Sequence, residues 1–169
     1  IAAIGGGGKG NSDINNAYNN GANNIVAVSD VDWNSAKGTF NKFPNAKKYR
    51  DFRVMLDEMG KSIDAVTIST PDHFHAFAAM ACMQLNKHVY VQKPMTHDIY
   101  EARMLTAAAD KYKVVTQMGN QGSSGDGVRQ LVEWYDAGII GDVHTVQIWT
   151  NRPIWPQGIP WSTAKPEVP

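Results

Sequence analysis

The stretch Gly5-Gly6-Gly7-Gly8-Lys9-Gly10 comes directly after the apolar run Ile1-Ala2-Ala3-Ile4. Its glycines at positions 5, 7 and 10 match the pattern G-x-G-x-x-G, in which a strand turns sharply into a helix. The first glycine permits the turn, the second lets a pyrophosphate approach the backbone, and the third lets helix and strand pack closely. Backbone N–H groups at the helix N-terminus would then face the phosphate charge. The candidate cofactor contacts from this stretch are Gly5, Gly7, Gly8, Lys9 and Gly10. Four glycines in a row also fit a flexible turn, so the interpretation depends on context.

A second feature supplies that context. The run 25–30 is apolar and ends in the carboxylate of Asp30, which lies 20 residues after Gly10. A dinucleotide-binding unit places there the acid that hydrogen-bonds the adenosine ribose. A carboxylate at this point repels a 2′-phosphate, so NAD is favoured over NADP as the cofactor. Asp32 is a rival for the role, and either acid could instead be a solvated turn residue.

Composition excludes several classes of protein. The chain has 169 residues, with 16 Lys+Arg against 16 Asp+Glu, so its formal net charge is zero. A nucleic-acid-binding surface needs clustered positive charge, and no apolar run reaches membrane-spanning length. The single cysteine, Cys82, excludes an internal disulfide and a Cys-rich zinc site, and its Ala and Met neighbours predict a buried structural thiol. His73 and His75 are two residues apart, which is not the spacing of a helical zinc pair, so no metal site is expected.

Both ends of the chain look cut. It starts inside a predicted strand without an initiator Met, and no predicted element follows the last residues, 165–169. We therefore expect a fragment, and the cytoplasm as its compartment. Export to the periplasm stays an alternative, because a signal peptide could precede Ile1.

Short apolar strands alternate with helices along most of the chain. The strands are predicted at 1–4, 25–29, 63–69, 87–91 and 114–116, and the helices between them are capped by Asp51, Asp72 and Thr96. This order predicts an α/β fold, a Rossmann-type doubly wound parallel sheet with the beginning of a second α/β domain. We place the Rossmann domain at 1–141 and the truncated start of the second domain at 142–169, with a strand at 143–150. Ligands of such sheets bind beyond the carboxyl ends of the strands.

Several segments together resemble the Gfo/Idh/MocA oxidoreductases, the glucose–fructose oxidoreductase and inositol dehydrogenase family. The segments are the glycine turn with Asp30, the run 69–75 (Ser-Thr-Pro-Asp-His-Phe-His), the run 87–94 (Lys-His-Val-Tyr-Val-Gln-Lys-Pro) and residues 138–143. They occur in the order and at the spacing of the family. The resemblance implies an NAD(P)-binding Rossmann domain followed by an α/β domain that helps to form the substrate pocket and the oligomer interface.

The resemblance also implies roles for individual residues. Lys93 would be the catalytic lysine, close to both nicotinamide and substrate, although a strand-end surface lysine is the alternative. We expect a cis Lys93-Pro94 bond. The remaining cofactor-binding candidates are Ser69, Thr70, Pro71, His75, Gln92 and Asn120, and the substrate candidates besides Lys93 are Trp155 and Trp161. The family usually has glutamate at the position of Gln92, so this chain keeps the size of the side chain and loses its charge.

The function expected from these features is NAD-dependent oxidation of a sugar, a cyclitol or a derivative, by hydride transfer to nicotinamide. One alternative is an NAD-dependent glycosidase that works by transient oxidation and elimination. Another is a non-catalytic NAD-binding domain. The fragment itself is expected to be inactive. As partners we expect a small-molecule substrate and, at full length, further copies of the chain, with no nucleic acid and no membrane insertion.

Overall fold

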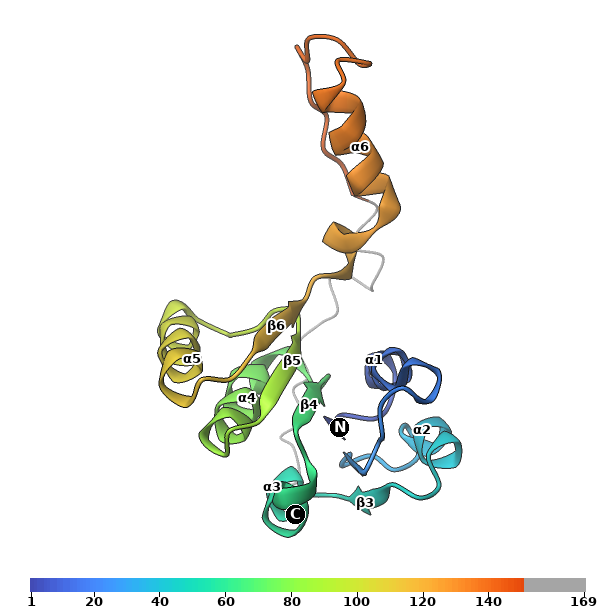
Figure 1. The fold of residues 1–169 in the computed structure, drawn as a ribbon, viewed down its shortest axis with the longest axis vertical. Coiled ribbons are helices and arrows are strands. Elements are labelled where there is room, and N and C mark those ends of the chain that lie inside the picture. The colour runs from blue at the N-terminus through green and yellow to red at the C-terminus, as the bar shows by residue number, and fades with distance from the viewer. Residues whose placement is uncertain (151–169) are drawn as a thin grey trace, which may run out of the picture. The chain divides into compact units, whose positions relative to one another are not determined.

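A six-stranded parallel sheet forms the centre of residues 1–124 (Figure 1), in a computed structural model that describes residues 1–150. The strands are β1 (Ala2–Ile4), β2 (Ala27–Ser29), β3 (Lys47–Tyr49), β4 (Ala65–Ile68), β5 (His88–Gln92) and β6 (Thr116–Gly119). Their order in the sheet is β3-β2-β1-β4-β5-β6, and every neighbouring pair is parallel. The order therefore reverses between β1 and β4, which is where a doubly wound sheet opens a crevice at its carboxyl edge.

Helices cover both faces of this sheet, as the sequence predicts. Figure 1 shows α1 (Lys9–Tyr18) and α2 (Lys37–Lys42) on one face and α3 (Phe52–Met59), α4 (His75–Gln84) and α5 (Ile99–Tyr112) on the other. Short 3-10 turns follow α1 at Asn19–Gly21 and α3 at Gly60–Ser62, and another precedes α4 at Asp72–Phe74; a fourth follows β6 at Gln121–Ser124. Right-handed crossovers between parallel strands need such helices, so the alternating sequence leads directly to this layering.

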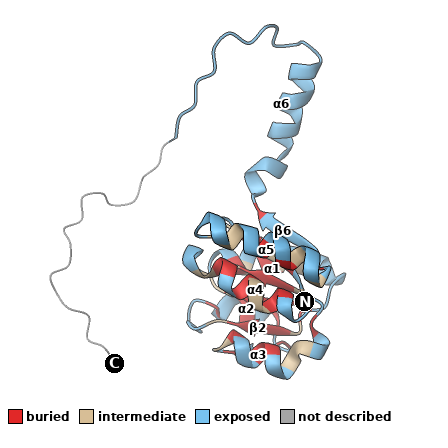
Figure 2. Cartoon of the chain, turned by 90° about the vertical axis from the view of Figure 1, so that its left-hand side faces the viewer, coloured by how far each residue is buried: buried red, intermediate tan, exposed pale blue. Residues whose placement is uncertain are grey.

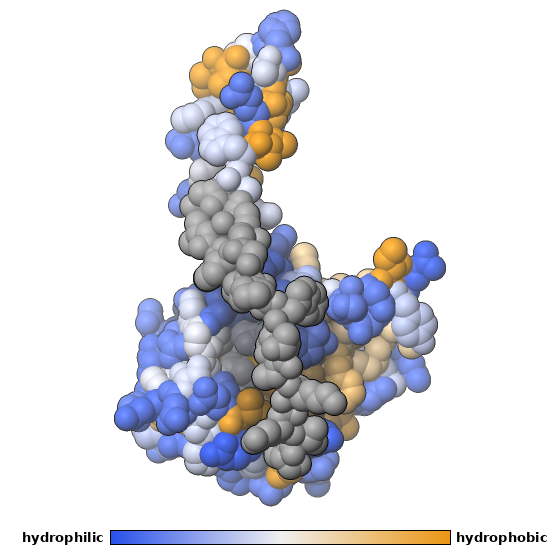
Figure 3. Space-filling view, turned by 180° about the vertical axis from the view of Figure 1, so that it is seen from behind, coloured by the Kyte–Doolittle hydropathy of each residue, from blue (hydrophilic) through white to orange (hydrophobic). Residues whose placement is uncertain are grey.

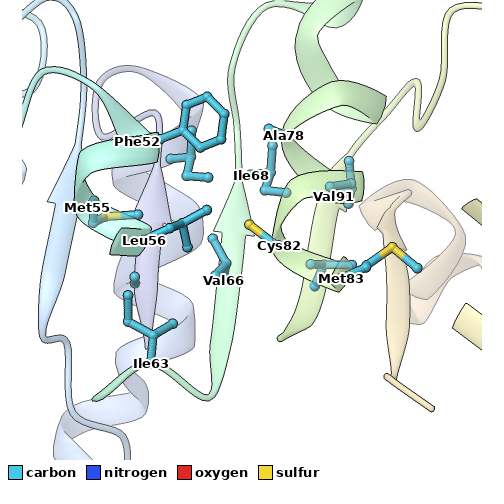
Figure 4. Packing of buried hydrophobic residues seen from close by; sticks show 14 of the residues in the cluster. Phe52, Met55, Leu56, Ile63, Val66, Ile68, Ala78, Cys82, Met83 and Val91 are labelled. Atoms are coloured by element: carbon cyan, nitrogen blue, oxygen red, sulfur yellow. The ribbon is translucent and has the colours of Figure 1, made fainter. Parts of the chain in front are cut away.

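The core divides into two clusters because successive residues of a strand point to opposite faces. Ala2 and Ile4 of β1 pack on the side of α3, α4 and α5, whereas Ala3 packs with Val28 against α1 and α2. Figure 4 shows the larger cluster, in which side chains of α3 and α4 meet those of β4 and β5. Figure 2 shows that the buried residues concentrate in the sheet and in the inward sides of the helices.

Helix α3 forms as its sequence predicts. The Asp51 side chain accepts a hydrogen bond from the Arg53 backbone N–H at 2.9 Å and so caps the helix. Phe52, Met55 and Leu56 are buried along one stripe, and Met59 packs partly buried against the same cluster.

Two predicted caps are wrong. Helix α5 is capped by Asp98, whose Oδ1 accepts from the Glu101 N–H at 2.8 Å, and not by Thr96. The Glu101 carboxylate in turn accepts from the His97 N–H, so the two acids form a reciprocal capping arrangement. Helix α4 receives no side-chain cap, because the Asp72–Phe74 turn precedes it.

The strand predictions fail at three places. Strand β3 was not predicted, because only Tyr49 of its three residues is buried. Strand β6 starts at Thr116 rather than Val114, because pairing with β5 sets Val89 opposite Thr116 and Gln92 opposite Gly119. The strand predicted at 143–150 is absent, and within this range Val146, Ile148 and Trp149 are exposed.

The chain divides into two compact units, Ile1–Ser124 and Gly125–Pro169. In the described part of the second unit, α6 (Asp126–Asp136) forms as predicted and carries an apolar stripe. The stripe residues Val128, Leu131, Val132 and Tyr135 are exposed, and hydrophobic surface is visible on this unit in Figure 3. The domain boundary at 141 and 142 stays a prediction. Within residues 1–150, no helix is long and apolar enough to cross a membrane.

Cys82 is fully buried in the larger cluster, as predicted, and burial raises the pKa of its thiol to about 12. Because the thiolate is the reactive form, we expect Cys82 to resist alkylation by iodoacetamide at pH 8 while the protein is folded. Labelling located by mass spectrometry should appear at Cys82 only after denaturation. Rapid labelling of the native protein would contradict this burial.

Candidate functional site

The turn between β1 and α1 is built on close backbone contacts. Gly5 has a φ of +86°, and a Cβ on it would lie 2.6 Å from the Ser69 carbonyl oxygen. A Cβ on Gly10 would overlap with the carbonyl oxygen of Gly5. These two positions therefore require glycine, one for its conformation and both for the space. The contacts bring the ends of β1 and β4 together at the point where the strand order reverses.

The N-terminus of α1 is left open at this turn. Gly8 is its N-cap residue, no side chain caps the helix, and its first turn holds no acidic residue. The first N–H groups of a helix have no partners within the helix, and the helix dipole favours negative charge beside them. This end of α1 can therefore receive a phosphate group.

Asp30 lies at the end of β2 and holds the glycine turn in place. Its Oδ2 accepts hydrogen bonds from the backbone N–H groups of Gly6 at 2.7 Å and Gly7 at 3.0 Å. Its Oδ1 accepts from the Asp32 N–H at 2.8 Å. A carboxylate has about four acceptor positions, so one stays free for a hydroxyl group. The rival acid Asp32 instead caps the following loop through the N–H groups of Asn34 and Ser35.

A cavity of about 780 Å³ opens beside Asp30 at the carboxyl edge of the sheet. Its lining includes Gly5, Gly7, Gly8, Ser69, Thr70 and Pro71 of the predicted site. It also includes four side chains that the sequence did not single out, namely Arg50, Arg53, Phe74 and Phe77. Hydrogen bonds from Arg53 lower the pKa of Asp51 to about 2, so this wall carries an ionised pair. Phe74 and Phe77 lie with their ring centroids 5.2 Å apart and form an apolar wall suited to a planar base.

A second cavity of about 230 Å³ adjoins the first through Ser69 and Thr70, which line both. Its lining also includes Lys9, His75, Gln92 and Lys93, all predicted from sequence. The Lys93-Pro94 bond is cis, as expected. Among the described residues, the Lys93 ammonium group makes no ion pair or hydrogen bond, and its side chain is exposed.

The His75 ring ties together two loops of the second cavity. Its Nδ1 lies 2.6 Å from the Pro94 carbonyl oxygen and its Nε2 lies 2.8 Å from the Thr70 carbonyl oxygen. Carbonyl oxygens only accept, so a neutral ring satisfies one contact and only the doubly protonated ring satisfies both. With an exposed fraction of 1%, His75 is buried between the Thr70 and Pro94 loops and contacts both.

The residues of the two cavities fit a dinucleotide. An extended ligand could run from Asp30, past the open end of α1, to Lys93. The buried Thr70 Oγ1 has no hydrogen-bond partner within residues 1–150, although it borders both cavities, and a ligand would supply one. Within the same residues, no cluster of three or more His, Cys, Asp or Glu side chains is placed to hold a metal ion.

The structure does not bring every predicted residue to the site. Asn120 is exposed and lines neither cavity; its backbone takes part in the turn that follows β6. Trp155 and Trp161 lie outside the described residues. The sequence analysis missed Asp13, which is buried beside Lys9, Ser69 and Gln92. Its spacing from Gly10 and Ile14 on the inward side of α1 was the available signal.

The parallel sheet, the glycine turn at its reversal point and the acid at the end of β2 define a Rossmann-type domain with a phosphate-binding turn. The model of the Gfo/Idh/MocA family, described as an oxidoreductase family with an NAD-binding Rossmann fold, matches residues 1–120. The chain therefore belongs to this family.

Several relatives of this chain are named as dehydrogenases of inositols. The inositol 2-dehydrogenase/D-chiro-inositol 3-dehydrogenase of Lacticaseibacillus casei is 31% identical over 145 residues, which cover 83% of this chain and 41% of the relative. The scyllo-inositol 2-dehydrogenase (NADP(+)) of Bacillus subtilis is 28% identical over 110 residues, which cover 65% of this chain and 30% of the relative. The solved myo-inositol 2-dehydrogenase of Lactobacillus plantarum matches with a TM-score of 0.74 at 24% identity, over 84% of this chain and 42% of that one, which shows the shared fold. This chain spans less than half the length of these relatives.

We expect Gly10→Ala to disrupt the site, because its Cβ has no room beside the Gly5 carbonyl oxygen. In the full-length protein, NAD affinity measured by calorimetry should fall at least tenfold, which is about 1.4 kcal/mol. Gly60→Ala is the matched control, since a Cβ there meets no atom within 4 Å. Equal affinities of the two variants would show that the turn does not need its close contact.

Proposed function

We propose that the protein is an NAD-dependent oxidoreductase that oxidises a hydroxyl group of a cyclitol, a sugar or a derivative. The observation that carries the proposal is that the two cavities share Ser69 and Thr70 in their linings, with the acid Asp30 at the first cavity and the exposed Lys93 at the second. The inositol dehydrogenases among the relatives support the substrate class. The domain boundary at 141 and 142 and a homo-oligomeric full-length protein are parts of the same proposal.

The residues of this chain have distinct roles in the proposed reaction. When bound, the nicotinamide cofactor supplies the hydride acceptor. Asp30 orients the ribose by accepting a hydroxyl hydrogen bond, and the end of α1 neutralises phosphate charge. Lys93 lies at the second cavity, where its ammonium group can hydrogen-bond the oxygen of the substrate hydroxyl and stabilise the negative charge that develops there as the hydroxyl proton passes to water. His75 contacts both the Thr70 and the Pro94 carbonyl oxygen and so holds these two loops of the second cavity together.

The preference for NAD over NADP follows from Asp30. Its carboxylate faces the first cavity, and a 2′-phosphate beside it would meet like charge. The NADP-dependent relative shows that both cofactors occur in the family, so the acid of this chain is the deciding feature.

The Asp30→Asn variant tests this preference, because it keeps an acceptor for Gly6 and Gly7 but removes the charge. We expect the ratio of kcat/KM for NAD to kcat/KM for NADP to fall by about tenfold or more, the effect of about 1.4 kcal/mol of repulsion. Asp32→Asn is the matched control and should change the ratio less than about twofold, since its side chain caps a loop. If Asp32→Asn lowers the ratio and Asp30→Asn does not, then Asp32 is the acid that contacts the ribose.

Lys93→Ala tests the catalytic role. With NAD and a panel of inositols, sugars and glycosides, absorbance of NADH measures turnover by the full-length protein. We expect kcat to fall by about 100-fold or more while NAD binding stays within about threefold. The exposed Lys61→Ala is the control for loss of one lysine.

Three results would contradict the proposed reaction. Unchanged turnover in Lys93→Ala would remove Lys93 from the mechanism. Release of sugar from a glycoside without net NADH would instead identify a glycosidase. NAD binding by a protein that turns over no compound of the panel would favour a binding domain.

A further inference from the structure

Asp13 is a buried carboxylate that the proposed reaction does not use. It lies on the inward side of α1 with an exposed fraction of 5%. Its Oδ1 lies 2.6 Å from the Lys9 ammonium nitrogen. Its Oδ2 accepts hydrogen bonds from the Ser69 hydroxyl at 2.7 Å and from the Gln92 amide nitrogen at 2.8 Å. Buried carboxylates persist in proteins when they are paired and hydrogen-bonded in this way.

The Gln92 side chain extends from this carboxylate to the backbone of the catalytic lysine. Its Nε2 donates to Asp13, and its Oε1 lies 3.4 Å from the Lys93 backbone nitrogen. Which end of an amide is the nitrogen is decided by its partners. A carboxylate accepts only and a backbone N–H donates only, so both partners require the same orientation of this amide.

The surroundings of Gln92 hold it in that position. Its exposed fraction is 6%, and a Cβ on Gly119 of the neighbouring strand would lie 2.7 Å from Gln92 Nε2 and 2.9 Å from its Cδ. The amide therefore packs directly on the backbone of Gly119. This packing leaves the Gln92 side chain little freedom to turn away from Asp13.

We propose that Asp13 is a positioning residue for the reaction, which acts through Gln92 to hold the Gln92-Lys93-Pro94 turn, and that residues 13 and 92 must be one acid and one amide. This proposal rests on the role of Lys93 in the proposed function. The departure of Gln92 from the usual glutamate then has a physical reason. A glutamate at position 92 would set two buried carboxylates about as far apart as Gln92 Nε2 and Asp13 Oδ2 are now, and like charges at that distance cannot both ionise without a large penalty.

The pair also determines which element carries the negative charge of this network. The carboxylate of this network belongs to α1, where Lys9 neutralises it, rather than to the strand that leads into Lys93. Lys93 itself stays without a paired side chain among residues 1–150, which leaves its ammonium group available to the substrate.

A double-mutant cycle in the full-length protein tests the pair. The variants are Gln92→Glu, Asp13→Asn and the combination of both, with the exposed Gln84→Glu as the matched control. At pH 8 we expect Gln92→Glu to lower the Tm by roughly 3 °C or more, and the combined variant to regain at least half of this loss, because one acid and one amide face each other again. Gln84→Glu should leave the Tm unchanged.

The dependence on pH identifies the cause of the loss. In Gln92→Glu, the facing carboxylate raises the folded-state pKa of one carboxyl group above its unfolded value. The loss of Tm should therefore be small near pH 5 and grow as pH rises through that folded-state pKa, and this growth with pH should be absent from the combined variant.

Hydrogen exchange of the peptide that contains Lys93 measures positioning without any substrate. Exchange there should speed up in Gln92→Glu and return toward wild type in the combined variant, while the peptide covering α2 stays unchanged. With a substrate found by the panel, kcat should fall about tenfold with the KM for NAD within about twofold, and the combined variant should recover kcat. A residue that only stabilises the fold would lower the Tm and leave kcat at 25 °C unchanged.

Gly119→Ala is an independent test of the proposal, because it displaces the Gln92 amide without altering charge. It should speed exchange in the same peptide, whereas Gly122→Ala, whose Cβ meets no atom within 4 Å, should not. Losses that simply add in the combined variant, a Tm defect that does not change with pH, or unchanged exchange around Lys93 would each overturn the proposal. A protein that oxidises no compound of the panel would refute the proposed function instead. The Tm and exchange results would still show whether residues 13 and 92 must be one acid and one amide.

Discussion

The steric contact between two backbones at the reversal point of the sheet is the constraint on which the site depends. The turn after β1 packs on the end of β4 so closely that Gly5 and Gly10 have no room for a side chain. This contact sets the spacing between the open end of α1 and the loop that begins at Ser69. Both cavities share that loop, so the separation of the phosphate-binding turn from Lys93 is fixed by atoms that take no part in chemistry.

Buried polar side chains also hold the strand ends around the second cavity. Asp13 accepts from α1, from the end of β4 and from the end of β5 through Lys9, Ser69 and Gln92. His75 makes a corresponding bridge on the other side, between the carbonyl groups of Thr70 and Pro94. Each strand end that borders the second cavity is thus held by a side chain of a neighbouring element. Networks of this kind specify one arrangement, because a partner that moves leaves a buried polar group unsatisfied.

The sequence was sufficient for the parts of the molecule that local pattern determines. Apolar runs that alternate with amphipathic segments predicted the doubly wound sheet. The spacing from Gly10 to Asp30 singled out that acid as a ribose ligand, but it did not predict that Asp30 also holds the glycine turn. Two of the failures depend on pairing across the sheet: Lys47–Tyr49 is a strand because β2 lies beside it, and β6 begins where β5 sets its register. Asp13 was missed for a similar reason, since its three partners lie on three different elements and only one of them, Lys9, is a neighbour in sequence.

The hydrogen bonds of Asp30 to Gly6 and Gly7 have a thermodynamic consequence for ligand binding. Ordering a flexible loop on association consumes part of the interaction free energy, and glycine-rich segments have the most conformational entropy to lose. In this protein the carboxylate already holds Gly6 and Gly7, the two middle residues of a run of four glycines. Part of this entropy is therefore lost on folding rather than on association, and a dinucleotide meets a turn whose backbone is already held by Asp30.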